Sequence, residues 1–397
     1  MSENGATQSW DGAVVASALG LTAFGVLMNY STTAALSIGE TLPPLALRHV
    51  TGVAVAILCG MLAARAPLAS WERISLWLWA GTVALLVLTL LFGVEANGAR
   101  RWLLIPGIPF AIQAAEPVKL TTALAVATLL ANATPKNLAS WALLQRVVLL
   151  VAVPVALLLL QPDFGSAVML CAVVGFVLFA AGLPMRVLAL PVVAVALGAA
   201  LYIAVRPYAG RRLQGFIDPW QTAHAEGFQL VQSFVAFGRG GAFGVGLGNG
   251  LQKLSYLPEA HTDFILSMVA EEVGLLGVLL VLGGFAALCF AGLRIAGRAR
   301  QPFALLAASA CTALIVVPAI CNAAVVMGLV PTKGLTLPFL SHGTNSLLCS
   351  ALAIGILLRA GRDANGSTAK SHGTWSRTAS FARRAAGGAK TMRRART

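Results

Sequence analysis

An acidic residue at the edge of a long apolar segment is the strongest candidate for chemistry in this sequence. Asp263 ends a polar stretch and is followed directly by Phe264-Ile265-Leu266. A carboxylate at such a boundary is partly removed from water and accepts a proton more readily, as a general base must. Glu271 and Glu272 follow inside the apolar segment, where ionisable side chains are functional by default.

A second group of polar residues surrounds Trp102, which Arg100 and Arg101 precede. Glu116 and Lys119 follow it and are three residues apart. A helix would place both on one face, where they can neutralise each other near a membrane. A purely structural ion pair is the alternative for these two, and Trp102 can equally be an aromatic residue of the membrane interface.

Three further polar segments interrupt the apolar background. Gln161 to Ser166 contains helix breakers, and Asp163 can cap the helix that follows. Residues 238–248 are rich in glycine, so their backbone can approach a phosphate or a sugar closely, or can simply be mobile. Pro331 to Ser346, with Lys333 and Ser341, is typical of a re-entrant or broken-helix element that lines a cavity.

The elements that carry these residues are membrane helices. Of the 397 residues, 58% are hydrophobic and only 11% charged, which excludes an ordinary soluble protein. About 20 apolar residues span a bilayer, and ten segments come near that length. They are residues 13–30, 45–64, 75–93, 117–133, 143–160, 165–182, 186–205, 264–293, 303–328 and 344–358. We therefore predict an all-α polytopic membrane protein of about ten transmembrane helices.

The charge distribution predicts the orientation of these helices. Ten of the 28 Lys and Arg residues lie between Arg359 and Arg396, beside a single acid, Asp363, and basic segments stay in the cytoplasm. An even number of spans places both termini on that side. We predict a cytoplasmic N-terminal segment (1–12), a membrane domain (13–360) with a large extracytoplasmic loop (206–263) between the seventh and eighth helices, and a basic, disordered cytoplasmic tail (361–397).

The cations predicted on the outer side indicate the kind of ligand. A net charge of +14 would suggest nucleic acid for a soluble protein, but in a membrane protein it suits membrane lipids, and we expect no nucleic-acid partner. Arg101, Lys119, Arg211, Arg212 and Lys333 all fall on the predicted outer side. Grouped cations there suit an anionic headgroup such as a diphosphate, although long loops also escape the charge rule.

Several ordered motifs resemble the SEDS family of peptidoglycan polymerases, whose members include FtsW, RodA and SpoVE, and FtsW most closely. The resemblance covers residues 13 to 360. Its motifs are Asn97 to Trp102, Gln113/Glu116/Lys119, Gln161 to Gly165, Arg211-Arg212 before Asp218-Pro219-Trp220, Gly227 to Ser233, Gly244 to Asn249, Leu257 to Phe264, and Lys333 to Pro338. The chain departs from the family pattern at Ala114-Ala115, where Pro-Ser is usual, and at His342, Thr344 and Asn345.

The resemblance implies a ten-helix inner-membrane fold and an inverting glycosyltransferase that polymerises lipid II. Asp263 would be the catalytic carboxylate, and Trp102, Arg101, Glu116, Lys119, Arg211, Arg212, Lys333 and Ser341 would bind substrate. Undecaprenyl diphosphate is the leaving group. A class B penicillin-binding protein and other division proteins at the septum are the implied partners. No cofactor is assigned; a divalent cation is an open alternative, without a metal site in the chain.

Two other functions fit the same sequence. A lipid II flippase would also have about ten helices and would use intramembrane acids such as Glu271 and Glu272. An inactive scaffold of the division machinery would tolerate the departures at residues 114–115 and 342–345. Most of the charges lie outside the spans rather than at mid-membrane, which favours the glycosyltransferase.

Overall fold

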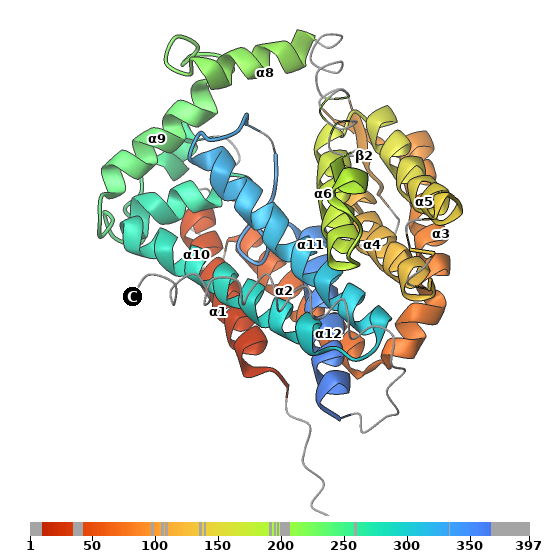
Figure 1. Ribbon diagram of the computed structural model, residues 1–397. Coiled ribbons are helices and arrows are strands. Elements are labelled where there is room, and N and C mark those ends of the chain that lie inside the picture. The colour runs from red at the N-terminus through yellow and green to blue at the C-terminus, as the bar shows by residue number, and fades with distance from the viewer. Residues whose placement is uncertain are drawn as a thin grey trace, which may run out of the picture.

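The computed structural model describes residues 10–34, 43–96, 99–104, 107, 110–134, 137–138, 140–189, 193, 196, 198, 207–257, 260–332 and 334–366. The chain forms a bundle of long helices, with shorter helices at one end (Figure 1). The long helices are α1 (Gly12–Ala34), α2 (Pro44–Arg65), α3 (Leu68–Phe92), α4 (Ala115–Ala131), α5 (Trp141–Leu160), α6 (Phe164–Ala180), α10 (Ile265–Arg298), α11 (Pro302–Val326) and α12 (Thr344–Gly366).

Smaller elements occupy two of the connections between these helices. The strands β1 (Val94–Ala96) and β2 (Ala99–Trp102) form an antiparallel hairpin between α3 and α4, an element that the all-α prediction did not include. Between α6 and α10 lie α8 (Pro207–Ile217), α9 (Phe228–Gly240) and a π-helical turn, η1 (Gln252–Tyr256). Figure 1 shows α8 at the top of the view, beyond the ends of the bundle helices.

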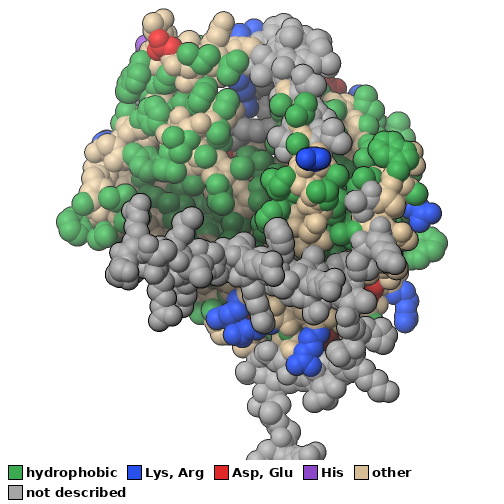
Figure 2. Space-filling view, in the orientation of Figure 1, with side chains coloured by type: hydrophobic (Ala, Val, Ile, Leu, Met, Phe, Trp, Pro, Cys, Tyr) green, Lys and Arg blue, Asp and Glu red, His purple; other side chains and the backbone are tan. Residues whose placement is uncertain are grey.

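The described helices confirm a multi-pass membrane protein. Seven of them are long and apolar enough to cross a bilayer (α1, α2, α3, α5, α10, α11 and α12), and α6 is a shorter apolar helix. Hydrophobic side chains cover most of the described surface in Figure 2, as lipid contact requires. Helices occupy nine of the ten predicted spans, while the span at 186–205 lies largely outside the described residues. The helix predicted to end at 358 continues to Gly366.

Helix α11 forms the centre of the bundle and α3 lies at its edge. In their most apolar stretches, 78% of the residues of α11 are buried inside the protein, against 17% for α3. Hydroxyl pairs join α3 to α4: Thr82 bonds Thr121 at 2.7 Å and Ser75 bonds Thr128 at 2.8 Å. Such pairs satisfy polar groups between membrane helices.

Helix α10 is broken at Gly274, whose φ of 76° and ψ of −167° interrupt the helix. Segment 241–246 inserts at this break and supplies the missing hydrogen bonds. The amides of residues 245 and 246 donate to the carbonyls of Glu271 and Glu272, both at 3.0 Å, and the amide of Leu275 donates to Gly241 at 2.9 Å. A Cβ at position 274 would lie 2.3 Å from the nitrogen of Gly244, so only glycine fits there. The sequence did not predict this break in α10. Residues 331–346, predicted as a re-entrant or broken-helix element that lines a cavity, supply Gly334, Leu335, Thr336, Pro338 and Ser346 to a cavity lining.

Candidate functional site

Asp263 lies in the turn that immediately precedes α10, at the end of the bundle where α4, α6 and α12 begin. The residue is half-buried. Its carboxylate packs against Gly334, because a Cβ on that glycine would lie 2.8 Å from Oδ2 of Asp263. Gly334 belongs to the irregular segment 327–343 that joins α11 to α12. The predicted catalytic side chain is therefore held against a backbone wall.

Gly334 also lines a small cavity. The cavity has a volume of about 80 Å³ and is lined by residues from β2, the N-terminal ends of α4, α6 and α12, the middle of α11 and residues 334–338. The lining residues are Arg101, Gln113, Glu116, Lys119, Asp163, Ser166, Met169, Leu314, Pro318, Gly334, Leu335, Thr336, Pro338, Ser346, Cys349 and Ser350. Three of the separate polar segments in the sequence thus converge on one cavity beside Asp263.

Glu116 and Lys119 form the ion pair that their spacing predicted. Lys119 Nζ lies 2.7 Å from Glu116 Oε1, and the side chains are 7% and 14% exposed, respectively. Both lie in the first turns of α4, where the helix dipole also favours the carboxylate. The pair places a cation in the cavity at a site where an unpaired charge would be costly.

The loop between α5 and α6 holds Arg101 in the cavity wall. Arg101 donates from Nε to the carbonyl of Gln161 at 3.3 Å and from Nη2 to the carbonyl of Pro162. Asp163 caps α6, as predicted, by accepting hydrogen bonds from the amide of Ser166 at 3.1 Å and its hydroxyl at 2.7 Å. The guanidinium of Arg101 is bound to neutral carbonyls, so its charge can act on a ligand in the cavity.

Ser341 is buried, and its hydroxyl is engaged in holding the backbone. It donates to the carbonyl of Thr262 at 2.5 Å and accepts a hydrogen bond from the amide of Leu337 at 2.7 Å. These contacts join the segment before α10 to the segment before α12. The structure therefore places Ser341 beside Asp263, in a connecting role rather than on the cavity surface.

Of the remaining predicted site residues, the three that the structure describes, Trp102, Arg211 and Arg212, do not line the cavity. Trp102 is at the end of β2 and is 37% exposed. Arg211 of α8 pairs with Glu226 at 2.9 Å. Arg212 donates to the carbonyl of Thr332 at 3.3 Å, so it contacts the segment that leads to the cavity. Lys333 lies outside the described residues.

His342 has two other histidines as neighbours, His261 in the turn before α10 and His49 in α2. The His342 ring lies 5.8 Å from that of His261 and 5.7 Å from that of His49, between centroids. Burial, and then the charge of His261, lower the pKa of His342 from its ordinary value. Within the described residues, no three His, Cys, Asp or Glu side chains are grouped as metal ligands.

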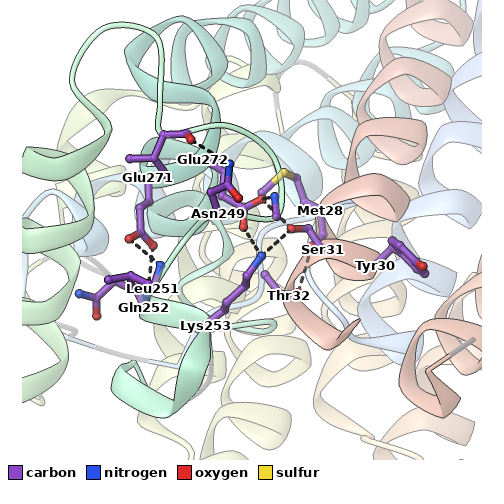
Figure 3. Close-up of polar contacts among 12 residues, drawn as sticks. Met28, Tyr30, Ser31, Thr32, Asn249, Leu251, Gln252, Lys253, Glu271 and Glu272 are labelled. Carbon is purple, nitrogen blue, oxygen red and sulfur yellow. Dashed lines mark hydrogen bonds and ion pairs between the residues drawn. The ribbon is translucent and has the colours of Figure 1, made fainter. Parts of the chain in front are cut away.

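Glu271 and Glu272 form a separate buried cluster with the glycine-rich segment and α1 (Figure 3). Glu272 accepts hydrogen bonds from Lys253 Nζ at 2.6 Å, Ser31 Oγ at 2.6 Å and the amide of Gly248 at 3.1 Å. Glu271 accepts from the amides of residues 251 and 252, at 2.9 and 3.1 Å, and lies 3.4 Å from Arg239. Both carboxylates are thus neutralised and bonded within the protein.

A larger cavity lies at the opposite end of α4. Its volume is about 490 Å³, and its walls include Asn132, Asn137, Ser140 and Arg146. None of the predicted site residues that the structure describes lines it. On α4 the nearest lining residues of the two cavities, Lys119 and Thr128, are nine residues apart, or about 14 Å at 1.5 Å per residue.

Asn322 was not among the residues predicted from the sequence, yet it contacts the backbone of Asp263. Its side-chain nitrogen donates to the carbonyl of Asp263 at 2.7 Å and to that of Leu335 at 2.6 Å. The signal in the sequence was a single polar amide near the end of an apolar span, four residues after Pro318. Polar residues at such positions are commonly directed into the bundle.

Comparisons with known proteins agree on one family. The profile of the FtsW, RodA and SpoVE cell cycle proteins matches residues 13–366. The chain is 41% identical over 355 residues to the "Probable peptidoglycan glycosyltransferase FtsW" of Halomonas elongata, covering 88% of this chain and 89% of that one. A protein of the same name from Halorhodospira halophila is 44% identical over 315 residues, or 78% of each chain.

Solved structures show the same fold. One chain of a peptidoglycan synthase complex that coordinates polymerization and crosslinking superposes with a TM-score of 0.74 at 27% identity, covering 90% of this chain and 99% of that one. The rod shape determining protein RodA of Thermus thermophilus gives a TM-score of 0.67 at 26% identity, covering 92% and 100%. With the family profile matched over most of its length, the chain belongs to the FtsW/RodA/SpoVE family of cell cycle proteins.

Proposed function

We propose that this protein is a peptidoglycan glycosyltransferase that polymerises lipid II at the outer face of the bacterial inner membrane. The observation that supports the proposal is the position of Asp263, whose carboxylate packs against Gly334, a residue that lines a cavity together with Arg101 and Lys119. A base beside two cations is the arrangement that glycosyl transfer from a diphosphate-linked donor needs.

In the proposed reaction Asp263 accepts the proton of the 4-hydroxyl group of the acceptor N-acetylglucosamine. The hydroxyl oxygen forms a bond to the anomeric carbon of the donor N-acetylmuramic acid. The bond between that carbon and the diphosphate oxygen breaks, and undecaprenyl diphosphate leaves with the electron pair. Attack opposite to the leaving group inverts the configuration at the anomeric carbon.

The charge that develops on the diphosphate is stabilised by cations in this proposal. Arg101 and Lys119 line the cavity, and charge-assisted hydrogen bonds from them to phosphate oxygens would strengthen as the bond breaks. Arg211, Arg212, Lys333, Trp102, Glu116 and Ser341 are the further predicted substrate-binding or site-forming residues. A divalent cation held by the diphosphate is the alternative source of positive charge.

The size of the cavity limits what it can hold in this conformation. Its volume of about 80 Å³ is well below the roughly 300–1,000 Å³ of ordinary ligand pockets. One phosphate group can be accommodated, whereas two lipid-linked disaccharides cannot. We infer that the saccharides lie at the mouth of the cavity, or that the 327–343 segment moves when they bind.

The flippase alternative loses its main support in this structure. Its intramembrane acids would be Glu271 and Glu272, but each has a cationic partner and hydrogen-bond donors from the glycine-rich segment. A transport site needs charges that can change partners as the substrate moves. An inactive scaffold would not require Asp263, and an activity assay distinguishes it from an enzyme.

We further propose a class B penicillin-binding protein as the partner and the division septum as the location. Relatives that carry the FtsW name support the location. The structural neighbour from a synthase complex that coordinates polymerization and crosslinking supports a partner that crosslinks. Lipid II, undecaprenyl diphosphate, other division proteins and membrane lipids complete the expected set of ligands.

The test uses the full-length protein in proteoliposomes with a class B penicillin-binding protein and labelled lipid II. We expect glycan strands from the wild type and none above background from Asp263→Asn. The Asp263→Asn protein should still insert and bind its partner. Movement of lipid II across the bilayer without polymer would favour the flippase, and neither product would favour the scaffold.

A further inference from the structure

Three consecutive carbonyls of the backbone immediately before α10 accept hydrogen bonds from α11 and from the connection between α11 and α12. The carbonyl of His261 accepts from the amide of His342 at 2.9 Å, and that of Thr262 accepts from the Ser341 hydroxyl at 2.5 Å. The carbonyl of Asp263 accepts from Asn322 at 2.7 Å. We call residues 261–263 the Asp263 segment. Its position depends on partners that come from α11 and from the segment before α12.

Asn322 is the partner that acts on Asp263 itself. It lies in the last two turns of α11 and is 1% exposed. Its Nδ2 carries two hydrogens and lies within hydrogen-bonding distance of two carbonyls, those of Asp263 at 2.7 Å and Leu335 at 2.6 Å. One side chain therefore joins the Asp263 segment to the wall of the cavity.

The orientation of the Asn322 amide is fixed by these two acceptors. Its Oδ1 is buried and accepts no hydrogen bond from the described residues. A rotated amide would place Oδ1 against two carbonyl oxygens and lose both hydrogen bonds. The Asn322 side chain thus donates two hydrogen bonds while its own acceptor stays unsatisfied. Because the loss of either hydrogen bond would cost free energy, the side chain stabilises this specific backbone arrangement.

The arrangement that Asn322 stabilises includes the reacting carboxylate. Leu335 follows Gly334, the residue whose backbone touches Asp263 Oδ2. Asn322 thus stabilises both the backbone of Asp263, which carries the carboxylate, and the backbone of Gly334 and Leu335, against which the carboxylate packs. A shift of either would alter the direction of the carboxylate relative to the cavity.

We propose that Asn322 is a positioning residue for Asp263. It sets the distance between the carboxylate and the cavity without touching substrate. This inference rests on the proposed glycosyltransferase function. It predicts a defect in the chemical step, since misplacement of a catalytic group by about 1 Å can lower a rate on the order of 100-fold, while substrate binding by Arg101 and Lys119 is unchanged.

The variants that test this role are Asn322→Ala, Asn322→Asp and Asn322→Gln. Alanine removes both donors. Aspartate keeps the shape but turns its oxygens toward two carbonyls, so it should be at least as harmful. Glutamine keeps the amide on a chain one methylene longer and should rescue part of the activity. Asn132→Ala is the matched control, because Asn132 makes a comparable amide-to-carbonyl bond to Thr128 at 3.0 Å at the other end of α4.

The first measurement is lipid II polymerisation by the full-length variants with the partner transpeptidase, over a range of lipid II concentrations and pH. We expect kcat of Asn322→Ala and Asn322→Asp to fall by about 30- to 100-fold with KM within about threefold of the wild type. The acidic limb of the pH profile, which reports the base, should shift in both. Asn322→Gln should retain more activity than either, and Asn132→Ala should match the wild type.

The second measurement is hydrogen exchange at the amides of Leu337 and His342, which does not depend on activity. Asn322→Ala should speed their exchange by on the order of tenfold, because these amides bond within the fastened region. Unchanged exchange would show that Asn322 does not stabilise the backbone of the Asp263 segment. Faster exchange with kcat within about twofold of the wild type would overturn the positioning role.

The proposed glycosyltransferase function and the positioning role of Asn322 can be contradicted separately. If the wild type makes no polymer, the proposed function fails and the exchange data alone decide whether Asn322 fastens the Asp263 segment. If Asn322→Ala does not yield folded protein, the comparison of Asn322→Gln with the wild type decides instead. Activity of Asn322→Gln equal to the wild type, with an unshifted pH profile and unchanged exchange, would then contradict the proposal.

Discussion

Two polar regions of this membrane protein, a few turns apart on α10, have opposite character. In the turn before the helix, Asp263 packs against Gly334, which lines a cavity. Further along, Glu271 and Glu272 are fully buried and bonded to Arg239, Lys253 and backbone amides. The first region leaves a carboxylate beside a space that a ligand can enter. In the second region, two carboxylates accept hydrogen bonds that hold the glycine-rich segment at the break in α10.

The comparison shows that an ionisable residue inside the membrane is not evidence of function until its partners are known. Glu271 and Glu272 satisfied the sequence criterion better than Asp263 did, because they lie deeper in the apolar segment. Their function in the structure is to accept hydrogen bonds from residues 248, 251 and 252, which lie around the break at Gly274. Such irregular backbone is stable at membrane depth only when its polar groups are satisfied within the protein.

The largest expected effect is on the stability of the second region. Lys253→Met removes the ammonium that lies 2.6 Å from Glu272 and leaves a buried carboxylate without its countercharge, which costs about 3–5 kcal/mol. Thermal unfolding in detergent should show a melting temperature lower by about 5 °C or more. The double variant Lys253→Met/Glu272→Gln should recover part of the loss, since glutamine carries no charge. An unchanged melting temperature for the single variant would contradict the account of this cluster.

A smaller effect, on activity alone, is expected at the first region. Gly334→Ala places a methyl group 2.8 Å from Oδ2 of Asp263, and the carboxylate, as the movable partner, must turn away. We expect polymerisation to fall by about tenfold at unchanged melting temperature. Gly343→Ala in the same connection is the control, because its new Cβ would meet Thr336 only at 3.4 Å. Equal activity of the two variants would show that the carboxylate does not depend on this wall.

The features that the sequence predicted depend on local spacing. The Glu116–Lys119 pair follows from a three-residue interval on a helix, and the cap by Asp163 follows from its position before an apolar run. Most of the apolar segments became helices with ends close to those predicted. Each of these features is determined by residues within about one or two turns of each other.

The features that could not be predicted depend on contacts between distant segments. Asn322 is 59 residues from Asp263, and Ser31 is 241 residues from Glu272. The glycine-rich segment was interpreted either as a backbone that approaches a phosphate or sugar or as a mobile loop, yet it inserts into the break of α10. Its composition does not show whether its exposed amides bind a ligand or another part of the protein, because either can supply hydrogen-bonding groups to them.

The smallest predicted effect is a change in folding stability with pH, caused by His342 in the connection between α11 and α12. Because the pKa of His342 is lowered in the folded protein, the unfolded chain binds the proton more readily. His342 therefore reduces folding stability as pH falls below its unfolded pKa of about 6.5, by at most about 1.4 kcal/mol per pH unit. The melting temperature of the wild type should fall between pH 7.5 and 5.5 by more than that of His342→Gln. An identical pH dependence of the two proteins would refute this effect.

One paired measurement tests the central claim most directly, namely that Asp263 performs chemistry and Glu272 maintains structure. Polymerisation of lipid II and thermal unfolding are measured on Asp263→Asn and Glu272→Gln in the same preparation. We predict that Asp263→Asn loses polymerisation by at least about 100-fold at an unchanged melting temperature, whereas Glu272→Gln melts earlier and keeps its activity per folded molecule. Normal glycan strands from Asp263→Asn, or loss of activity from a fully stable Glu272→Gln, would contradict the account.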